Sequence, residues 1–342
     1  MKAIRLHQHG GPDALRLDDL PDPQAGPGQA VIDVKAAGIN QLDLWVRRGM
    51  PGRTIPFPRI PGADAAGVVR EVGAGVTNVT PGQRVLLNPH TSCGRCDACS
   101  AGNMSMCLSY AIWGEHTDGT YAQRIAVPAH CAIPIPDALP FDVAAAAPLV
   151  FVTSWRMLLV RGRLRAGEDV LIHSVGAGVG TTCLAMAKMT GARVIATAST
   201  DEKCEKAKAL GADIVLNSTR EDVAKRVREI TAKRGVDVVV DYIGKDTWGK
   251  SLLCLKRGGR LVTCGATTGF DPPEDLRHIF FRQLEIHGST MGNNDDLMAA
   301  LRCLFQGRLR PVIDSTFPLA AAADAHRKIE ARATFGKVIL TP

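Results

Sequence analysis

Strand-like and helix-like segments alternate through the middle of this chain, and this alternation limits the fold more than any other feature. It begins with the apolar run Asp169–Ser174, followed by a glycine-rich turn and the apolar helical segment Thr181–Thr190. Further strands are expected at Arg193–Ala198, Ile214–Asn217, Val236–Tyr242 and Arg260–Cys264, with helices between them at Asp201–Leu210, Asp222–Thr231 and Trp248–Leu255. This alternation predicts a parallel, doubly wound sheet, and therefore an α/β protein.

The chain before residue 130 has a different texture. Short β-like runs are separated by proline and glycine, which is typical of a β-rich, irregular domain. The runs are Ala30–Ala36, Ala66–Val72, Arg84–Leu87 and Tyr121–Val127. A length of 342 residues agrees with two domains. The last segment, a helix at Asp295–Gln306 and a strand at Lys337–Leu340, fits either domain on these grounds.

Four of the ten cysteines lie close together in the first domain, with the spacing C-x2-C-x2-C-x7-C. They are Cys93, Cys96, Cys99 and Cys107. A chain of this length with six other scattered cysteines is not a secreted disulfide scaffold, so the cluster indicates metal binding in a reducing compartment. Four thiolates close a tetrahedral zinc site without an open position, which predicts one structural zinc.

Two other interpretations of this cluster are weaker. A ferredoxin-type iron–sulfur site uses C-x2-C-x2-C-x3-C followed by proline, whereas here the last gap is seven residues and Leu108 follows. The remaining alternative is a chance group of redox-active thiols. Because a closed zinc site does no chemistry, the function must lie elsewhere in the chain.

The turn between the first strand and helix of the alternating region is the strongest binding signal. It contains Gly176, Ala177, Gly178, Val179 and Gly180, with three glycines in five residues. The strict G-x-G-x-x-G pattern is not met. Between a strand and a helix, however, glycines let the backbone approach a pyrophosphate, and the helix N-terminus favours its negative charge. The alternative is a tight turn that only packs the helix on the strand.

The end of the second strand bears on the choice of cofactor. An NAD site usually has an acid there, to bind the ribose hydroxyls. Here the strand ends near Ala198 and is followed by Ser199, Thr200 and Lys203, a group suited to a 2′-phosphate. Asp201 lies near the position of the acid but is interpreted as a helix cap. NADP(H) is therefore favoured over NAD(H), with an ordinary solvated Lys203 as the alternative.

Composition excludes several classes of protein. The net charge of +7 is spread along the chain without a basic block, and aromatic residues make up 5%, so no nucleic-acid partner is expected. No apolar stretch reaches the length of a membrane helix, and no apolar signal segment begins the chain. A cytoplasmic enzyme acting on a small molecule is the expectation.

Together these pieces resemble the medium-chain dehydrogenase/reductase superfamily over essentially the whole chain. The landmarks are GQAVIDVKAAGIN, PGADAAGVVREVG, PGQRV, CGRCDACSAGNMSMC, DGTYAQRIAVP, the glycine turn, LKRGGRLVTCG and FGKVIL. The resemblance implies a GroES-like catalytic domain at residues 1–150, completed by 291–342, and a Rossmann domain at 151–290. It also implies a structural zinc lobe near 93–107, an active site in the interdomain cleft, and a homodimer paired through the sheet edge near Leu284–Gly288.

The same resemblance assigns residues near the nicotinamide. These are Thr153 and the backbone around Cys264, Gly265 and Ala266.

The departures from the zinc alcohol dehydrogenases concern their catalytic zinc. The cysteine of their G-x-C-x-x-D stretch is Asn40 here, the histidine of G-H-E is Ala63, and the third ligand position falls near Leu149. Only Asp64 still offers a good ligand, while open catalytic zinc sites use three protein ligands. No catalytic zinc is therefore expected. The G-x-N-x-x-D pattern is similar to that of the zinc-independent quinone oxidoreductases.

Without a Lewis acid, a conjugated acceptor is easier to reduce than a simple alcohol is to oxidise. The hypothesis is NADPH-dependent reduction of a quinone or an α,β-unsaturated carbonyl. Asn40 would contact the acceptor, Asp43 would orient Asn40 or a water, and Trp45 would wall the pocket. Their structural alternatives are a turn residue, a helix cap and core packing, respectively.

Two other functions stay open at this point. One is an alcohol dehydrogenase that recruits zinc through Asp64 and unexpected ligands. The other is a cofactor-binding protein without turnover, with a crystallin-like or RNA-binding role.

Overall fold

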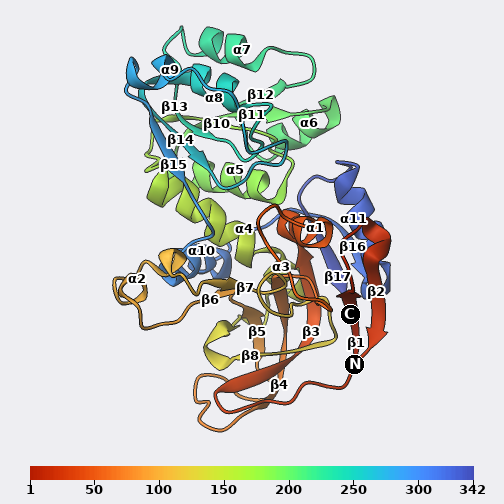
Figure 1. The fold of residues 1–342 in the computed structure, drawn as a ribbon. Helices are drawn as coiled ribbons and strands as arrows, with labels where there is room; N and C mark the ends of the chain where they lie inside the picture. The colour runs from red at the N-terminus through yellow and green to blue at the C-terminus, as the bar shows by residue number, and fades with distance from the viewer. The chain divides into compact units, whose positions relative to one another are not determined.

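The chain folds into two units, and the computed structural model describes all of residues 1–342. The first unit contains residues 1–149 and 311–342, and the second contains residues 150–310 (Figure 1). None of the helices combines the length and the apolar character needed to cross a membrane.

A seven-stranded sheet forms the centre of the first unit, with the order β16-β17-β3-β4-β5-β9 and with β8 also paired to β3. Only the β16–β17 pair is parallel. The sheet strands are β3 Gln29–Ile39, β4 Asp64–Val72, β5 Arg84–Leu87, β8 Arg124–Pro128, β9 Ala132–Pro134, β16 Ile313–Pro318 and β17 Lys337–Thr341. The two-stranded sheets are β1 Lys2–Leu6 with β2 Leu15–Asp19, and β6 His90–Thr91 with β7 Ala111–Ile112.

Short helices accompany this sheet. They are α1 Gln41–Arg48, α2 Asp97–Ser100, α3 Phe141–Ala146 and α11 Ala322–Glu330, and α4 Pro148–Trp155 continues into the second unit. Helix α3 comes very close to β3, since a Cβ on Gly38 would lie 2.5 Å from the carbonyl oxygen of Ala145. The absence of a side chain at Gly38 therefore lets α3 pack against the C-terminal end of β3, next to the candidate site.

The second unit contains a six-stranded parallel sheet of order β12-β11-β10-β13-β14-β15, so the predicted doubly wound α/β fold is confirmed (Figure 1). Its strands are β10 Asp169–Ile172, β11 Arg193–Ala198, β12 Ile214–Asn217, β13 Val236–Val240, β14 Leu255–Thr263 and β15 Glu285–Gly288. Its helices are α5 Gly178–Thr190, α6 Asp201–Ala209, α7 Val223–Ile230, α8 Trp248–Cys254, α9 Arg277–Phe280 and α10 Asn294–Phe305. Strands β10 and β13 are buried along their whole length, as expected for parallel strands covered on both faces.

Two sequence-based expectations are wrong in detail. Residues 291–310, assigned to the first domain, lie in the second unit, where Asp296 of α10 pairs with Arg156 at 2.9 Å. The strand expected from Tyr121 begins only at Arg124. The Tyr121 backbone instead bonds to Ile4 and Pro61, and its ring is fully buried.

Candidate functional site

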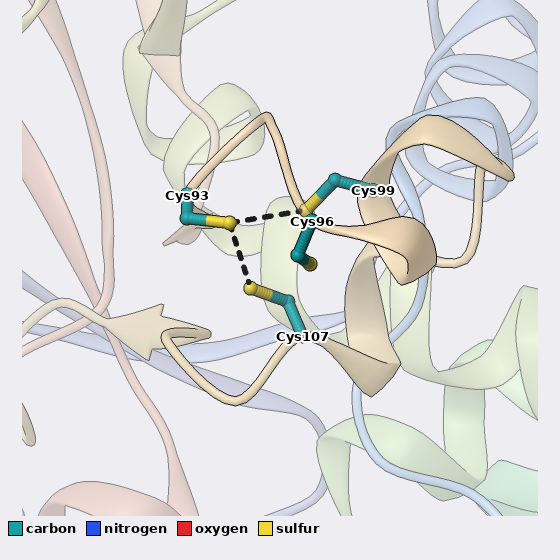
Figure 2. A group of neighbouring side chains, drawn as sticks. All are labelled: Cys93, Cys96, Cys99 and Cys107. Atoms are coloured by element: carbon teal, nitrogen blue, oxygen red, sulfur yellow. Dashed lines mark hydrogen bonds between the residues drawn. The ribbon is translucent and has the colours of Figure 1, made fainter.

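The four clustered cysteines converge on one point of the first unit (Figure 2). Their sulfur atoms all lie within 4.8 Å of one another. Cys93 Sγ is 3.9 Å from Cys99 Sγ and 3.5 Å from Cys107 Sγ. A tetrahedral zinc with Zn–S bonds of about 2.3 Å requires sulfur separations of about 3.8 Å. The donor set and its spacing therefore fit a closed zinc site.

Local turns bring these thiols together. Gly94 and Gly102 both adopt positive φ, and Cys96 is the N-cap of α2. Hydrogen bonds from the backbone N–H groups of Arg95 and Cys96 lower the pKa of the Cys93 thiol to about 6, which favours the thiolate that a metal needs. By contrast, burial raises the pKa of isolated thiols such as Cys131 to about 12.

A second polar cluster is built from three neighbouring strands of the same unit. Strand β3 pairs with β4 on one side and with β17 on the other. Asn40 directly follows β3, Asp64 begins β4, and Lys337 begins β17. All three residues are buried, and Asp64 has no exposed surface. The sheet therefore places an amide, a carboxylate and an ammonium group together in its interior.

Both carboxylate oxygens of Asp64 accept hydrogen bonds within this cluster. Asp64 Oδ1 accepts from the backbone N–H of Leu149 at 2.8 Å. Asp64 Oδ2 accepts from Asn40 Nδ2 at 2.9 Å and from Lys337 Nζ at 3.1 Å. Lys337 Nζ also donates to Asn40 Oδ1 at 2.5 Å. Both oxygens of Asp64 are therefore already bonded within the protein.

These residues do not fit a catalytic zinc. The positions that the resemblance assigns to catalytic-zinc ligands carry the Asn40 amide and the buried apolar side chains of Ala63 and Leu149. The one remaining carboxylate, Asp64, is paired with an ammonium ion rather than free for a metal. The donor set thus offers zinc neither a thiolate nor an imidazole, and its one carboxylate is already bonded within the protein.

Asp43 lies beside this cluster and links it to a buried hydrogen-bonded chain. Its Oδ2 accepts from the backbone N–H of Asn40 at 2.8 Å and from the Tyr121 hydroxyl at 3.0 Å. The Tyr121 hydroxyl also lies 3.2 Å from His326 Nε2. Burial raises the pKa of Asp43 to about 7 and lowers that of His326 to about 3. Trp45 lies half-buried on the same helix, α1.

The glycine-rich turn 176–180 of the second unit leads into α5, with Ala177 as the N-cap. The first N–H groups of such a helix have no partner within it, which suits them to a phosphate. A Cβ on Gly180 would lie 2.5 Å from the Tyr242 hydroxyl and 2.7 Å from the Val175 carbonyl oxygen. Only glycine lets the helix pack this closely to its strand, so this turn has the features of a dinucleotide-binding turn.

The end of β11 differs from the sequence-based expectation. The N-cap of α6 is Thr200, whose hydroxyl accepts from the backbone N–H of Lys203, so the assignment of Asp201 as the cap is wrong. The Asp201 carboxylate instead pairs with Arg220 at 2.6 Å and accepts from Asn217 Nδ2 at 2.7 Å. Arg220 was missed because the β12–α7 loop carries no recognisable motif.

The other residues assigned to the cofactor lie in the second unit. Ser199 follows β11, and Cys264, Gly265 and Ala266 follow β14. They share an edge with the glycine-rich turn, because the carboxyl ends of parallel strands meet at one edge of a sheet. Thr153 lies on α4, where its buried hydroxyl is 3.8 Å from Met291 Sδ.

Sequence reasoning missed the contacts of Lys337 with Asn40 and Asp64, and that of the Tyr121 hydroxyl with Asp43. The available signal was a lysine at the start of the otherwise apolar strand Lys337–Leu340. A charged residue in a buried strand needs a buried partner, and Asp64 was the candidate acid without one.

Comparison with known proteins agrees with this fold. Residues 26–137 match the alcohol dehydrogenase GroES-like domain, and residues 178–306 match the zinc-binding dehydrogenase family. The 2-haloacrylate reductase of Burkholderia sp is 35% identical, covering 99% of this chain and 98% of the relative. Quinone oxidoreductase 1 of Escherichia coli (strain K12) is 30% identical, covering 99% of both chains.

Among solved structures, one described as an NAD-dependent alcohol dehydrogenase is 43% identical, with a TM-score of 0.96 over 100% of both chains. These matches span both units and the site residues described above. The chain therefore belongs to the medium-chain dehydrogenase/reductase superfamily and is an NAD(P)H-dependent oxidoreductase.

Proposed function

We propose that this enzyme reduces a quinone or an α,β-unsaturated carbonyl with NADPH and uses no catalytic zinc. The observation that carries the proposal is the pairing of Asp64 with Lys337 and Asn40, which leaves the family's metal position without a free ligand. The names of two relatives, a 2-haloacrylate reductase and a quinone oxidoreductase, agree with conjugated acceptors.

Asn40 would donate a hydrogen bond to the acceptor oxygen, on which negative charge develops during reduction. Asp43 would hold Asn40 through its backbone N–H, and Trp45 would form an apolar wall beside the acceptor. When bound, the cofactor supplies the hydride. By resemblance, Thr153 and residues 264–266 would adjoin the nicotinamide. Water would supply the proton that completes the product.

The preference for NADPH rests on the charges at the end of β11. No acid ends this strand, since its last residue is the buried Ala198. Ser199, Lys203 and Arg220 would bind a 2′-phosphate, while the Asp201 carboxylate is already bonded to Arg220 and Asn217.

Two further parts of the proposal concern assembly. One structural zinc would occupy the four thiolates. Strand β15 is the edge of its sheet and carries the exposed Ile286, and the exposed Phe280 and Phe281 precede it in the chain. An apolar sheet edge of this kind supports a homodimer formed by pairing of two β15 strands.

The second candidate function is an alcohol dehydrogenase, favoured by the description of the structure that is 43% identical. Assays of the purified enzyme with quinones, enones and alcohols, each with both cofactors, decide between them. Faster turnover of alcohols with NAD⁺ than of any conjugated acceptor with NADPH would refute the proposal. The site assignment would be refuted if the three variants N40A, T153A and G178W all still oxidised NADPH.

A further inference from the structure

The ion pair between Lys337 and Asp64 is buried, and a contribution to the stability of the fold does not by itself explain its presence. The side chain of Lys337 is 3% exposed and that of Asp64 is 0% exposed. Removing two charges from water is costly, and apolar residues of similar size often stabilise a protein as well as such a pair does. A buried ammonium ion next to the proposed acceptor site is therefore a candidate for a functional role.

The ion pair determines which way the Asn40 amide faces. The Asn40 oxygen accepts from the Lys337 ammonium at 2.5 Å, and its nitrogen donates to the Asp64 carboxylate at 2.9 Å. Turning the amide over would place its N–H groups against the ammonium and its oxygen against the carboxylate. Since both contacts would then be repulsive, the amide has a single orientation.

The same contacts make the Asn40 nitrogen a stronger donor. A cation bonded to the amide oxygen withdraws electron density from the nitrogen and polarises its N–H bonds. One N–H bonds to Asp64. The Asn40 nitrogen also lies 3.5 Å from the Gly38 carbonyl oxygen, a separation too long for a strong hydrogen bond. One polarised N–H group thus remains for a further acceptor.

We propose that Lys337 is a positioning residue that orients and polarises Asn40 toward the acceptor oxygen. This inference rests on the proposed reduction of a conjugated acceptor. In that reaction the hydride of NADPH forms a C–H bond at the β-carbon, NADPH becomes NADP⁺, and the π electrons move to the carbonyl oxygen. Water then protonates the resulting enolate. Lys337 acts through Asn40 on the oxygen that gains this charge.

The test compares a neutral version of the ion pair with a matched control. K337M alone leaves a buried, unpaired carboxylate and risks unfolding, so the informative variant is D64N/K337M. The control is R156M/D296N, which neutralises the buried Arg156–Asp296 pair of the second unit, far from Asn40 in sequence. Circular dichroism and the Kd for NADPH verify that each variant is folded.

The kinetic readout is kcat and KM for the acceptor at saturating NADPH. D64N/K337M is expected to lower kcat at least about tenfold with the Kd for NADPH unchanged, while R156M/D296N keeps kcat. Adding N40A to D64N/K337M should cost little more, because both changes remove the same interaction. A folded D64N/K337M with kcat within about twofold of wild type, or additive effects with N40A, overturns the proposal.

A spectroscopic readout separates this inference from the proposed function. With ¹⁵N-asparagine labelling and N40A for assignment, the Asn40 side-chain N–H resonances should be shifted and slow to exchange in the wild type. Both properties should be lost in D64N/K337M. Unchanged resonances overturn the positioning role even in an active enzyme. A wild type that reduces no conjugated acceptor instead refutes the proposed function, whatever the resonances show.

Discussion

The cysteine lobe and the Asn40–Asp64–Lys337 cluster are two groups of polar side chains in the same unit, and they differ in the charge that each would carry. In the lobe, four thiol groups converge from a segment of fifteen residues. In the cluster, one carboxylate is matched by one ammonium ion and one amide. The comparison teaches that the side-chain chemistry of each cluster, and not the unit that both share, determines whether the cluster is suited to a metal.

The largest expected effect comes from removing one thiolate of the lobe. C107S should reduce bound zinc from about one per chain to nearly none and lower the free energy of unfolding by more than about 3 kcal/mol. The reason is that structural zinc contributes roughly 10–16 kcal/mol of binding free energy in isolated zinc fingers. Elemental analysis and thermal unfolding measure the two effects.

C131S is the matched control for this prediction, because Cys131 is a buried thiol outside the cluster. It should keep its zinc. Zinc retained by C107S at the wild-type level would mean that the lobe is not a four-thiolate site, and the comparison between the two clusters would fail.

A smaller effect is expected from the acid beside the second cluster. Because the pKa of Asp43 is raised to about 7, the folded state holds a proton that the unfolded chain releases near pH 4. The free energy of unfolding of the wild type should therefore fall relative to D43N by about 1.4 kcal/mol per pH unit between about pH 4 and 7. Denaturant titrations across this range measure the difference.

The lowered pKa of His326 acts in the opposite direction, since its unfolded form takes up a proton as the pH falls below about 6.5. Both proteins contain His326, so the difference between them isolates Asp43. A difference that does not change with pH would show that Asp43 is ionised in the fold, and the buried cluster would then carry a net negative charge.

The smallest effect concerns the exposed ion pair between Arg220 and Asp201, in contrast to the buried pair between Lys337 and Asp64. R220A should weaken binding of NADPH about fivefold and leave binding of NADH unchanged, because an exposed charge contributes only about 1 kcal/mol. Fluorescence titration measures both dissociation constants. The control is K225A, which removes a charge on the neighbouring helix α7 and should leave both dissociation constants unchanged. Equal weakening of both cofactors by R220A would contradict a 2′-phosphate site.

Patterns that depend on neighbouring residues were predictable from the sequence. Strands β5, β11 and β12 have the predicted bounds because each is an apolar run between turn residues. The four thiols and the glycine-rich turn are also local patterns, and the structure brings each group together.

The errors involve partners that are distant in the sequence. Tyr121 looks like a strand residue but bonds through its hydroxyl to Asp43, 78 residues away. Helix α10 was assigned to the wrong domain because its anchor, Arg156, lies 140 residues before Asp296. Lys337 was overlooked because its two partners lie 297 and 273 residues away. Propensity and spacing carry no information about such contacts.

The position of Lys337 near the end of the chain also has a consequence during synthesis. The second unit is complete once residue 310 has left the ribosome, whereas the first unit still lacks β16 and β17. Until β17 emerges, the Asp64 carboxylate lacks the Lys337 ammonium ion with which it is buried in the folded protein. The unit that begins first is thus finished last, and nascent chains that stop before Lys337 should expose an incompletely formed sheet to chaperones and proteases.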